Sequence, residues 1–188
     1  MIGICGGIGS GKSVVSRILR LRGEAVYDCD LEAKRIMDSS AEVLSALYER
    51  YGDAVCPAGG PICRRELARR VFGSNEERLW LNSLVHRLVR EDVAAWHDLN
   101  REVGLGRCYV ESAILASSGL AEMCDEIWVV TASEEIRLAR IKVRDSLDEE
   151  SIRKRILSQQ KEEKLIADSG IPVRIIDNSG FIPVLPQI

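Results

Sequence analysis

The sequence lacks any uninterrupted run of about 18 apolar residues, so we expect no membrane-spanning helix and no membrane partner. It begins without a basic leader or a long apolar stretch before its first glycines, so we expect no secretory signal peptide. Repeats and low-complexity segments are absent as well. With 188 residues, 46% of them hydrophobic and 29% charged, the chain suits one globular α/β domain with a small appended lobe.

No two of the six cysteines form a C-x-x-C pair, which argues against a zinc site. We interpret them as reduced thiols that pack as small hydrophobic side chains in a cytoplasmic protein. An excess of positive charge is also missing, because 26 Lys and Arg stand against 29 Asp and Glu. The net charge of −3 gives no general attraction to nucleic acid, so we predict no nucleic-acid partner. The sequence carries no signal for an oligomeric state.

Five short apolar segments are typical of buried strands. They are residues 2–5, 24–27, 107–110, 126–131 and 173–176. Helices are expected at 13–21, 64–72, 76–102 (with one break at most), 134–145 and 148–166. Ser39 and Glu42 are spaced as a capping box for a helix that runs through Tyr48. Strands that alternate with helices predict an α/β fold, a parallel sheet flanked by helices with an inserted helical lobe.

The segment GGIGSGKS at residues 6–13, called the phosphate loop below, matches the pattern G-x-x-x-x-G-K-[ST]. It lies between a predicted strand and a predicted helix, which is the context that makes the pattern specific. Glycines allow successive backbone N–H groups to turn toward one anion, and the N-terminus of the next helix points its N–H groups to the same place. Lys12 is expected to reach the β- and γ-phosphates, and Ser13 to place its hydroxyl on Mg²⁺. The sequence therefore predicts a nucleoside triphosphate site.

Three classes of protein share this loop: GTPase switches, mechanical or regulatory ATPases, and small-molecule kinases. The sequence has no N-K-x-D guanine-reading motif, and its D-x-x-G match at 177–180 lies too near the C-terminus to serve as a switch. A motor ATPase usually ends an apolar strand with an acid that holds the water on Mg²⁺, and Glu111 is only a weak match. The small size and the helical lobe favour a kinase.

Asp28 and Asp30 follow the second predicted strand, at the edge of the sheet where the phosphate loop also lies. A kinase needs a group that accepts the proton of the attacking hydroxyl, and a carboxylate there suits that role. In extended chain, carboxylates two residues apart face opposite ways, so we expect only one to face the substrate. The alternative is that both cap the next helix.

Arginines supply the remaining candidates. Arg137, Arg140 and Arg144 share one face of a predicted helix, where they either stabilise charge on the transferring phosphoryl group or form a solvated basic face. Arg64 and Arg65 in the helical lobe are candidates for phosphates on the acceptor. His86 lies in an apolar helical pattern, where a histidine is more often a packed residue.

Taken together, these segments resemble the dephospho-coenzyme A kinase family in the family's order over nearly the entire chain. The matching segments are GGIGSGKS at 6–13, D-x-D at 28–30, RRELARRVF from 64, LNSLVH from 81, AILASSGL from 113, R-x-x-x-R at 140–144 and DNSG at 177–180. Three positions depart from the family pattern: Cys5 replaces a threonine, Arg87 a proline and Ser117 a glutamate.

The resemblance implies transfer of phosphate from Mg·ATP to the 3′-hydroxyl of the ribose of dephospho-coenzyme A. It implies a nucleotide core at about 1–30 and 104–188, a coenzyme-binding helical lobe at about 31–103 and a small lid at about 141–160. By position, Asp30 resembles the general base and Arg140 the phosphate-contacting arginine, and Arg144 lies where the lid arginine or its neighbour would fall.

The predicted site has four groups of residues. The catalytic candidates are Asp30, Lys12, Arg140 and Arg144; the nucleotide-binding candidates are Gly6, Gly7, Ile8, Gly9, Ser10, Gly11, Lys12, Ser13 and Val14; the substrate-binding candidates are Asp28, Asp30, Arg64, Arg65 and His86; the metal-binding candidate is Ser13. The implied cofactors are ATP and Mg²⁺, and the implied substrate is dephospho-coenzyme A. The alternatives are another small-metabolite or nucleoside kinase of the same fold and a non-catalytic nucleotide-binding relative.

Overall fold

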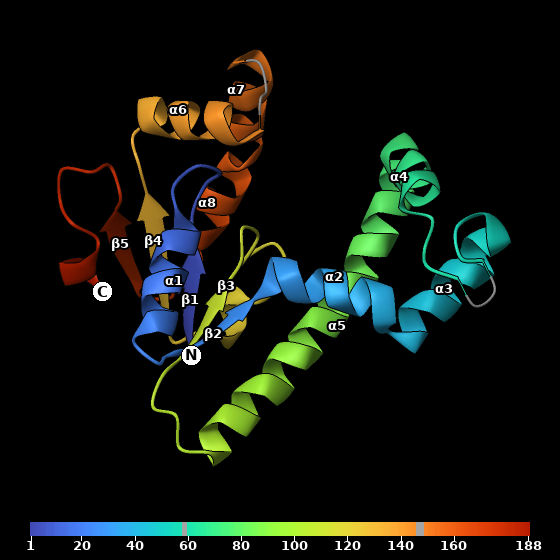
Figure 1. Ribbon diagram of the computed structural model, residues 1–188, viewed down its shortest axis with the longest axis horizontal. Coiled ribbons are helices and arrows are strands. Elements are labelled where there is room, and N and C mark those ends of the chain that lie inside the picture. The colour runs from blue at the N-terminus through green and yellow to red at the C-terminus, as the bar shows by residue number, and fades with distance from the viewer. Residues whose placement is uncertain (58–59, 146–148) are drawn as a thin grey trace. The chain divides into compact units, whose positions relative to one another are not determined.

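Five parallel strands form one sheet in the order β2-β3-β1-β4-β5 (Figure 1). The computed structural model describes residues 1–57, 60–145 and 149–188. The strands are β1 (Ile2–Cys5), β2 (Ala25–Asp28), β3 (Cys108–Glu111), β4 (Glu126–Thr131) and β5 (Val173–Asp177). The central strand β1 pairs with β3 on one side and with β4 on the other. All five predicted strands are confirmed, each within one residue of the expected bounds.

Eight α-helices connect or follow the strands in the described part of the chain. They are α1 (Lys12–Leu21), α2 (Cys29–Ser39), α3 (Ala41–Tyr51), α4 (Arg64–Gly73), α5 (Asn75–Glu102), α6 (Glu134–Asp145), α7 (Glu149–Ser158) and α8 (Gln160–Ala167). Helix α5 runs unbroken. The helical pattern expected at 148–166 is confirmed from 149 on as two helices, α7 and α8, which are divided at Gln159; residue 148 lies outside the described residues. None of the described helices is long and apolar enough to cross a membrane.

The chain divides into two structural units. The first contains Met1–Asp28 and Trp96–Ile188, and the second contains the helical segment Cys29–Ala95. The end of α5 belongs to the first unit, where Trp96 packs edge-on against Tyr27 with ring centroids 5.4 Å apart. The helical segment therefore ends earlier than the residue 103 expected from the sequence.

Helix α1 covers one face of the sheet, and α8 lies on the other (Figure 1). Alternate residues of each strand point to opposite faces, so Ile4 and Trp128 pack against Leu19 of α1, whereas Cys5 and Val129 face α8. Both faces of β1 and β4 are thus covered, as expected for the centre of a parallel sheet. This burial fixes the carboxyl end of β1, from which the phosphate loop departs.

The helical unit Cys29–Ala95 is built from α2, α3, α4 and most of α5. Helix α3 is capped by Ser40, whose side-chain oxygen accepts from the N–H of Val43. The capping box predicted at Ser39 is wrong, because Ser39 is the last residue of α2 and its hydroxyl donates to the carbonyl oxygen of Arg35, 2.7 Å away. Whether this unit binds a coenzyme stays a prediction.

The predicted lid at 141–160 includes residues 146–148, which lie outside the described residues. The described parts of that range are the end of α6, helix α7 and the first residue of α8.

Candidate active site

The phosphate loop runs from the end of β1 to the first turn of α1, as the sequence predicts. Three of its glycines, Gly6, Gly9 and Gly11, have φ angles of 145°, 78° and 93°. Side chains disfavour these conformations, and space is missing as well, because a Cβ on Gly6 would lie 2.2 Å from the carbonyl oxygen of Val130. Packing and backbone conformation therefore both require glycine there.

Some backbone N–H groups of the loop have no acceptor among the described residues and are available to bind an anion. The N–H groups of Gly9 and Gly11 donate to no described residue. The Nζ of Lys12 donates to the carbonyl oxygen of Gly6, 2.7 Å away, so the ammonium group is held at the mouth of the loop. Donors and charge at a helix N-terminus suit a polyphosphate.

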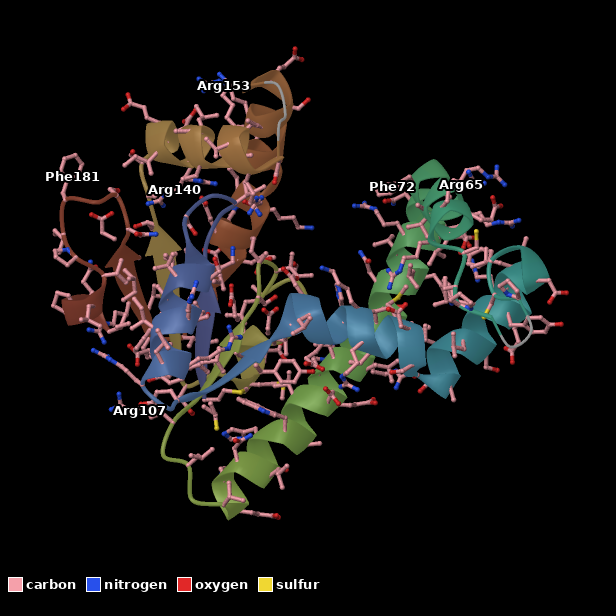
Figure 2. The ribbon with its side chains drawn as sticks, viewed as in Figure 1. Arg65, Phe72, Arg107, Arg140, Arg153 and Phe181 are labelled. Atoms are coloured by element: carbon pink, nitrogen blue, oxygen red, sulfur yellow. The ribbon has the colours of Figure 1, made fainter. Side chains whose placement is uncertain are left out.

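Two arginines of α6 bind the outer side of the loop. The Nε of Arg137 donates to the carbonyl oxygen of Ile8 at 2.9 Å. The Nη1 of Arg140 lies 3.2 Å from the carbonyl oxygens of both Gly9 and Ser10, and Figure 2 shows Arg140 between α6 and the loop. The structure therefore brings the predicted Arg140 to the phosphate loop.

Asn178, which follows β5, was not among the predicted site residues. The buried side chain of Asn178 donates through Nδ2 to the carbonyl oxygen of Ser10 at 2.8 Å. The backbone carbonyl oxygen of Asn178 accepts from Nη2 of Arg140 at 2.8 Å. The DNSG segment at 177–180 is the sequence signal for it. Hydrogen bonds of Asn178 and Arg140 thus connect the carboxyl end of β5 to the phosphate loop.

Two carboxylates lie at the carboxyl ends of neighbouring strands. Asp28 ends β2 and Glu111 ends β3, and the two residues are paired in the sheet register. Burial raises the pKa of Glu111 above its ordinary value, the nearby charge of Asp28 raises it further, and Ser16 and Lys12 act in the opposite direction. The oxygen atoms of Asp28, Glu111 and Ser13 are the donor type that Mg²⁺ prefers.

Replacing Glu111 by Gln is expected to reduce the pH dependence of the free energy of unfolding. Because the folded protein raises the pKa of Glu111 above 4.5, it holds this proton more tightly than the unfolded chain does, and stability falls as the pH rises above that value. At pH 7 Glu111→Gln should therefore gain stability relative to the wild type, and the gain should shrink toward about pH 4.

Urea unfolding at both pH values measures this difference, with the exposed Glu122→Gln as control. A wild type that is more stable than Glu111→Gln at pH 7 but not near pH 4 would contradict the prediction.

Other predicted residues are not brought to the loop. Arg144 forms a two-point contact with its neighbour Asp145, at 2.6 and 2.9 Å, and makes no bond to the phosphate loop. Asp30 lies exposed in the first turn of α2, so it is not in extended chain, and the argument that it faces away from Asp28 for that reason is wrong.

The remaining substrate candidates lie in the helical unit. Arg64 pairs with Asp38 at 2.6 Å, and Arg65 is exposed and has no ion pair with any described residue. His86 is half-buried on α5, and burial lowers its pKa, with the nearby charge of Arg90 contributing.

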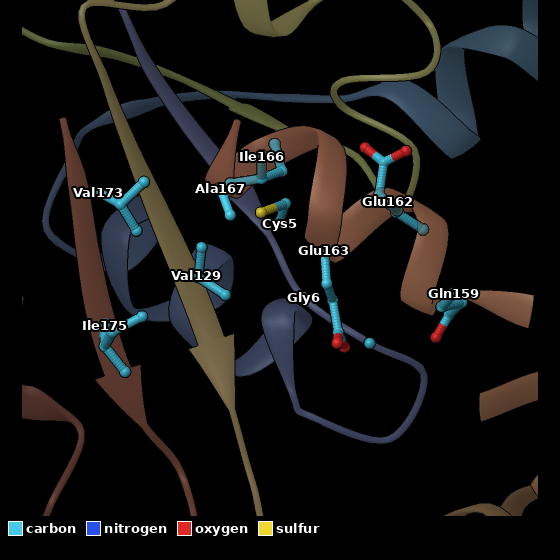
Figure 3. A pocket seen from close by; sticks show the side chains of 12 residues that line it. Cys5, Gly6, Val129, Gln159, Glu162, Glu163, Ile166, Ala167, Val173 and Ile175 are labelled. Carbon is cyan, nitrogen blue, oxygen red and sulfur yellow. The ribbon is translucent and has the colours of Figure 1, made fainter. Parts of the chain in front are cut away.

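A largely apolar pocket of about 360 Å³ lies beside the loop, between α8 and the sheet (Figure 3). The Cys5 side chain lines it, and burial, followed by the charge of Glu162, raises the pKa of that thiol to about 12. At its rim Gln159 accepts a hydrogen bond from the N–H of Ile8 at 2.6 Å. Glu162 accepts from the N–H groups of Ala116 and Ser117, so a carboxylate of α8 binds the backbone of that segment. All six cysteines are free thiols.

A glycine-rich loop between a parallel strand and a helix, with a lysine and two arginines around it, defines a P-loop nucleotide-binding protein. The family model for dephospho-CoA kinase matches residues 1–183. The dephospho-CoA kinase of Porphyromonas gingivalis is 43% identical over the whole chain and 90% of that protein. That of Corynebacterium diphtheriae is 34% identical over the whole chain and 92% of that protein. The chain belongs to the dephospho-CoA kinase family and is an ATP-dependent kinase.

Solved structures show the same fold. TT1252 from Thermus thermophilus is 32% identical, with a TM-score of 0.75 over 99% of this chain and 92% of that one. A dephospho-CoA kinase from Campylobacter jejuni, 23% identical, has a TM-score of 0.68 over 99% of this chain and 90% of that one. The predicted fold class and family are therefore confirmed, whereas the roles of single residues stay predictions.

Proposed function

We propose that this protein transfers the γ-phosphate of ATP to the 3′-hydroxyl of the ribose of dephospho-coenzyme A, giving coenzyme A and ADP. The observation that carries this proposal is the phosphate loop, in which the N–H groups of Gly9 and Gly11 have no acceptor among the described residues and Lys12 lies beside the carbonyl of Gly6, in a chain that matches the family from residue 1 to 183. Catalysis then consists mainly of positioning and charge stabilisation.

The nucleotide is assigned to residues 6–14. Backbone N–H groups hold the phosphates, Lys12 contacts the β- and γ-phosphates, and Arg140 stabilises charge at the same loop. Among the described residues no group of three or more His, Cys, Asp or Glu could hold a metal by itself, which suits Mg²⁺ because it usually keeps waters and phosphates as ligands. Ser13 would hold Mg²⁺, and Glu111, whose carboxylate interacts with the charge of Lys12, is a second candidate. The ion would neutralise charge on the phosphates.

The acceptor hydroxyl is assigned to Asp30, which accepts its proton as it attacks the γ-phosphate. Asp30 is the second residue of α2, which begins directly after Asp28, the last residue of β2 at the carboxyl end of the sheet. Asp28, Arg64, Arg65 and His86 are assigned to substrate binding. Arg144 is assigned to the lid as a second cation for the transferring group, which requires it to exchange Asp145 for a phosphate.

A coupled ADP-release assay with Mg·ATP tests the proposal, with dephospho-coenzyme A, adenosine, shikimate or no acceptor. We expect release that depends on dephospho-coenzyme A alone. Release with another acceptor would indicate a different small-metabolite kinase. Binding of ATP without turnover on any acceptor would indicate a non-catalytic relative, and would direct attention to Cys5, Arg87 and Ser117.

A further inference from the structure

Three successive carbonyl groups of the phosphate loop accept hydrogen bonds from two arginines of one helix. Arg137 binds the carbonyl oxygen of Ile8, and Arg140 binds those of Gly9 and Ser10. The two arginines are three residues apart on α6 and therefore lie on the same side of that helix. The two arginines thus hold the middle of the loop, at residues 8–10.

A hydrogen bond to a backbone carbonyl group also fixes the direction of the N–H group in the same peptide. In a trans peptide the C=O of one residue and the N–H of the next point in opposite directions, and the described chain has no cis peptide bond. Arg137, bound to the carbonyl of Ile8, therefore sets the N–H of Gly9. Arg140 and Asn178, bound to the carbonyl of Ser10, set the N–H of Gly11. Neither of these two N–H groups has an acceptor among the described residues.

Glycine makes this support necessary. Gly9 has a φ of 78°, and glycine populates positive and negative φ about equally, so the peptide plane before it can rotate at low cost. Rotation would turn the N–H of Gly9 away from the centre of the loop. A guanidinium bound to the Ile8 carbonyl opposes that rotation, because the bond would be lost.

The charge of Arg137 is also left without an acidic partner. Neither Arg137 nor Arg140 forms an ion pair with a described carboxylate. The Nη2 of Arg137 is buried and has no acceptor in the described structure, and a Cβ added to Gly7 would lie only 2.2 Å from it. Two unneutralised cations against one loop produce a field that favours a polyanion.

We propose that Arg137 is a positioning residue of the phosphate loop, which holds the Ile8–Gly9 peptide so that the N–H of Gly9 faces the polyphosphate of the nucleotide. The proposal rests on the assignment of the nucleotide to this loop, and is independent of which acceptor is phosphorylated. Arg137 acts from the outer side of the loop, through the backbone.

Arg137→Gln tests the proposal, with Lys142→Gln as the matched control, because Lys142 is an exposed cation of the same helix. Dissociation constants of ADP, ATP and inorganic tripolyphosphate are measured by calorimetry, together with kcat and KM for ATP. We expect Arg137→Gln to bind all three ligands about tenfold more weakly, and Lys142→Gln to remain within about twofold of the wild type. Because the loop binds ground state and transition state alike, KM should rise and kcat should change little.

Arg137→Lys separates positioning from charge alone. A lysine keeps the charge but has no guanidinium to hold the loop, so we expect at most partial recovery of ADP binding. Full recovery of ADP binding by Arg137→Lys would overturn the positioning role, and so would ADP binding by Arg137→Gln within about twofold of the wild type. If Arg137→Gln does not fold, Arg137→Lys decides alone: weakened ADP binding supports the role and unchanged binding overturns it. If Arg137→Gln binds ADP more weakly but the wild type does not phosphorylate dephospho-coenzyme A, the proposed substrate is rejected. The positioning role of Arg137 is still supported in that case.

Discussion

Lys12→Met is expected to lower kcat by roughly 10²- to 10³-fold, the scale seen when one preorganised charge-stabilising donor is removed from an active site. Lys12 is half-buried at the start of α1, and its ammonium group lies at the mouth of the phosphate loop beside the carbonyl of Gly6. Charge develops on the oxygens of the transferring group, and methionine fills a similar volume without supplying a cation.

Lys142→Met is the matched control, because the same charge is removed from an exposed position on α6. Initial rates with saturating ATP and dephospho-coenzyme A measure the effect, and circular dichroism checks that both variants fold. Equal rates for Lys12→Met and Lys142→Met would rule out a catalytic role for Lys12.

Asp30→Asn is expected to lower kcat by at least about a hundredfold, while the dissociation constant of ATP stays within about twofold of the wild type. Asparagine keeps the size and polarity of the side chain but cannot accept the proton of the attacking hydroxyl. Asp30 also lies in the first turn of α2, where a carboxylate favours the helix, so a small loss of stability should accompany the substitution.

Glu32→Gln provides the control for that second effect. Glu32 is in the same first turn and pairs with Arg35, so its replacement removes the same charge from the same helix end. A kcat for Asp30→Asn as high as that of Glu32→Gln would refute the general-base assignment and favour the capping role of Asp30. A loss of ATP binding in Asp30→Asn would refute it differently, by indicating a role in the nucleotide site.

The strands and the phosphate loop were predictable from sequence because their signals are local. Buried parallel strands are short, mainly apolar runs, and glycine or a polar residue lies within two residues of the end of each of the five. The loop motif contains glycines that the backbone conformation requires, followed by a lysine at the start of the helix. The motif in the sequence therefore indicates the conformation of the loop. Its position between β1 and α1 follows from the same pattern.

Side-chain partners were less predictable, because they depend on what the rest of the chain brings nearby. The sequence places Arg137, Arg140 and Arg144 on one helix face. It does not show that only Arg137 and Arg140 contact the phosphate loop. Arg144 lies one turn further on and binds Asp145 instead. Asp30 was misplaced because α2 begins immediately after β2, with no extended residues between them.

The end of the helical unit was missed for a similar reason. The helical pattern continues to residue 102, so sequence periodicity shows no boundary at Ala95. The boundary comes from Trp96, whose ring packs against Tyr27 of β2. Contacts between residues far apart in sequence leave no periodic signal.

The pairing of β1 has a consequence for the order in which this protein folds during synthesis. Ile2 pairs with Tyr109 of β3 and with Glu126 of β4, so β1 has no partner in the sheet until the long segment up to β3 and β4 has been synthesised. Such non-local pairing makes folding slow, because a large loop is closed before its contacts form. The nucleotide site, which begins at the end of β1, is thus completed late, and ATP can stabilise only the nearly finished fold.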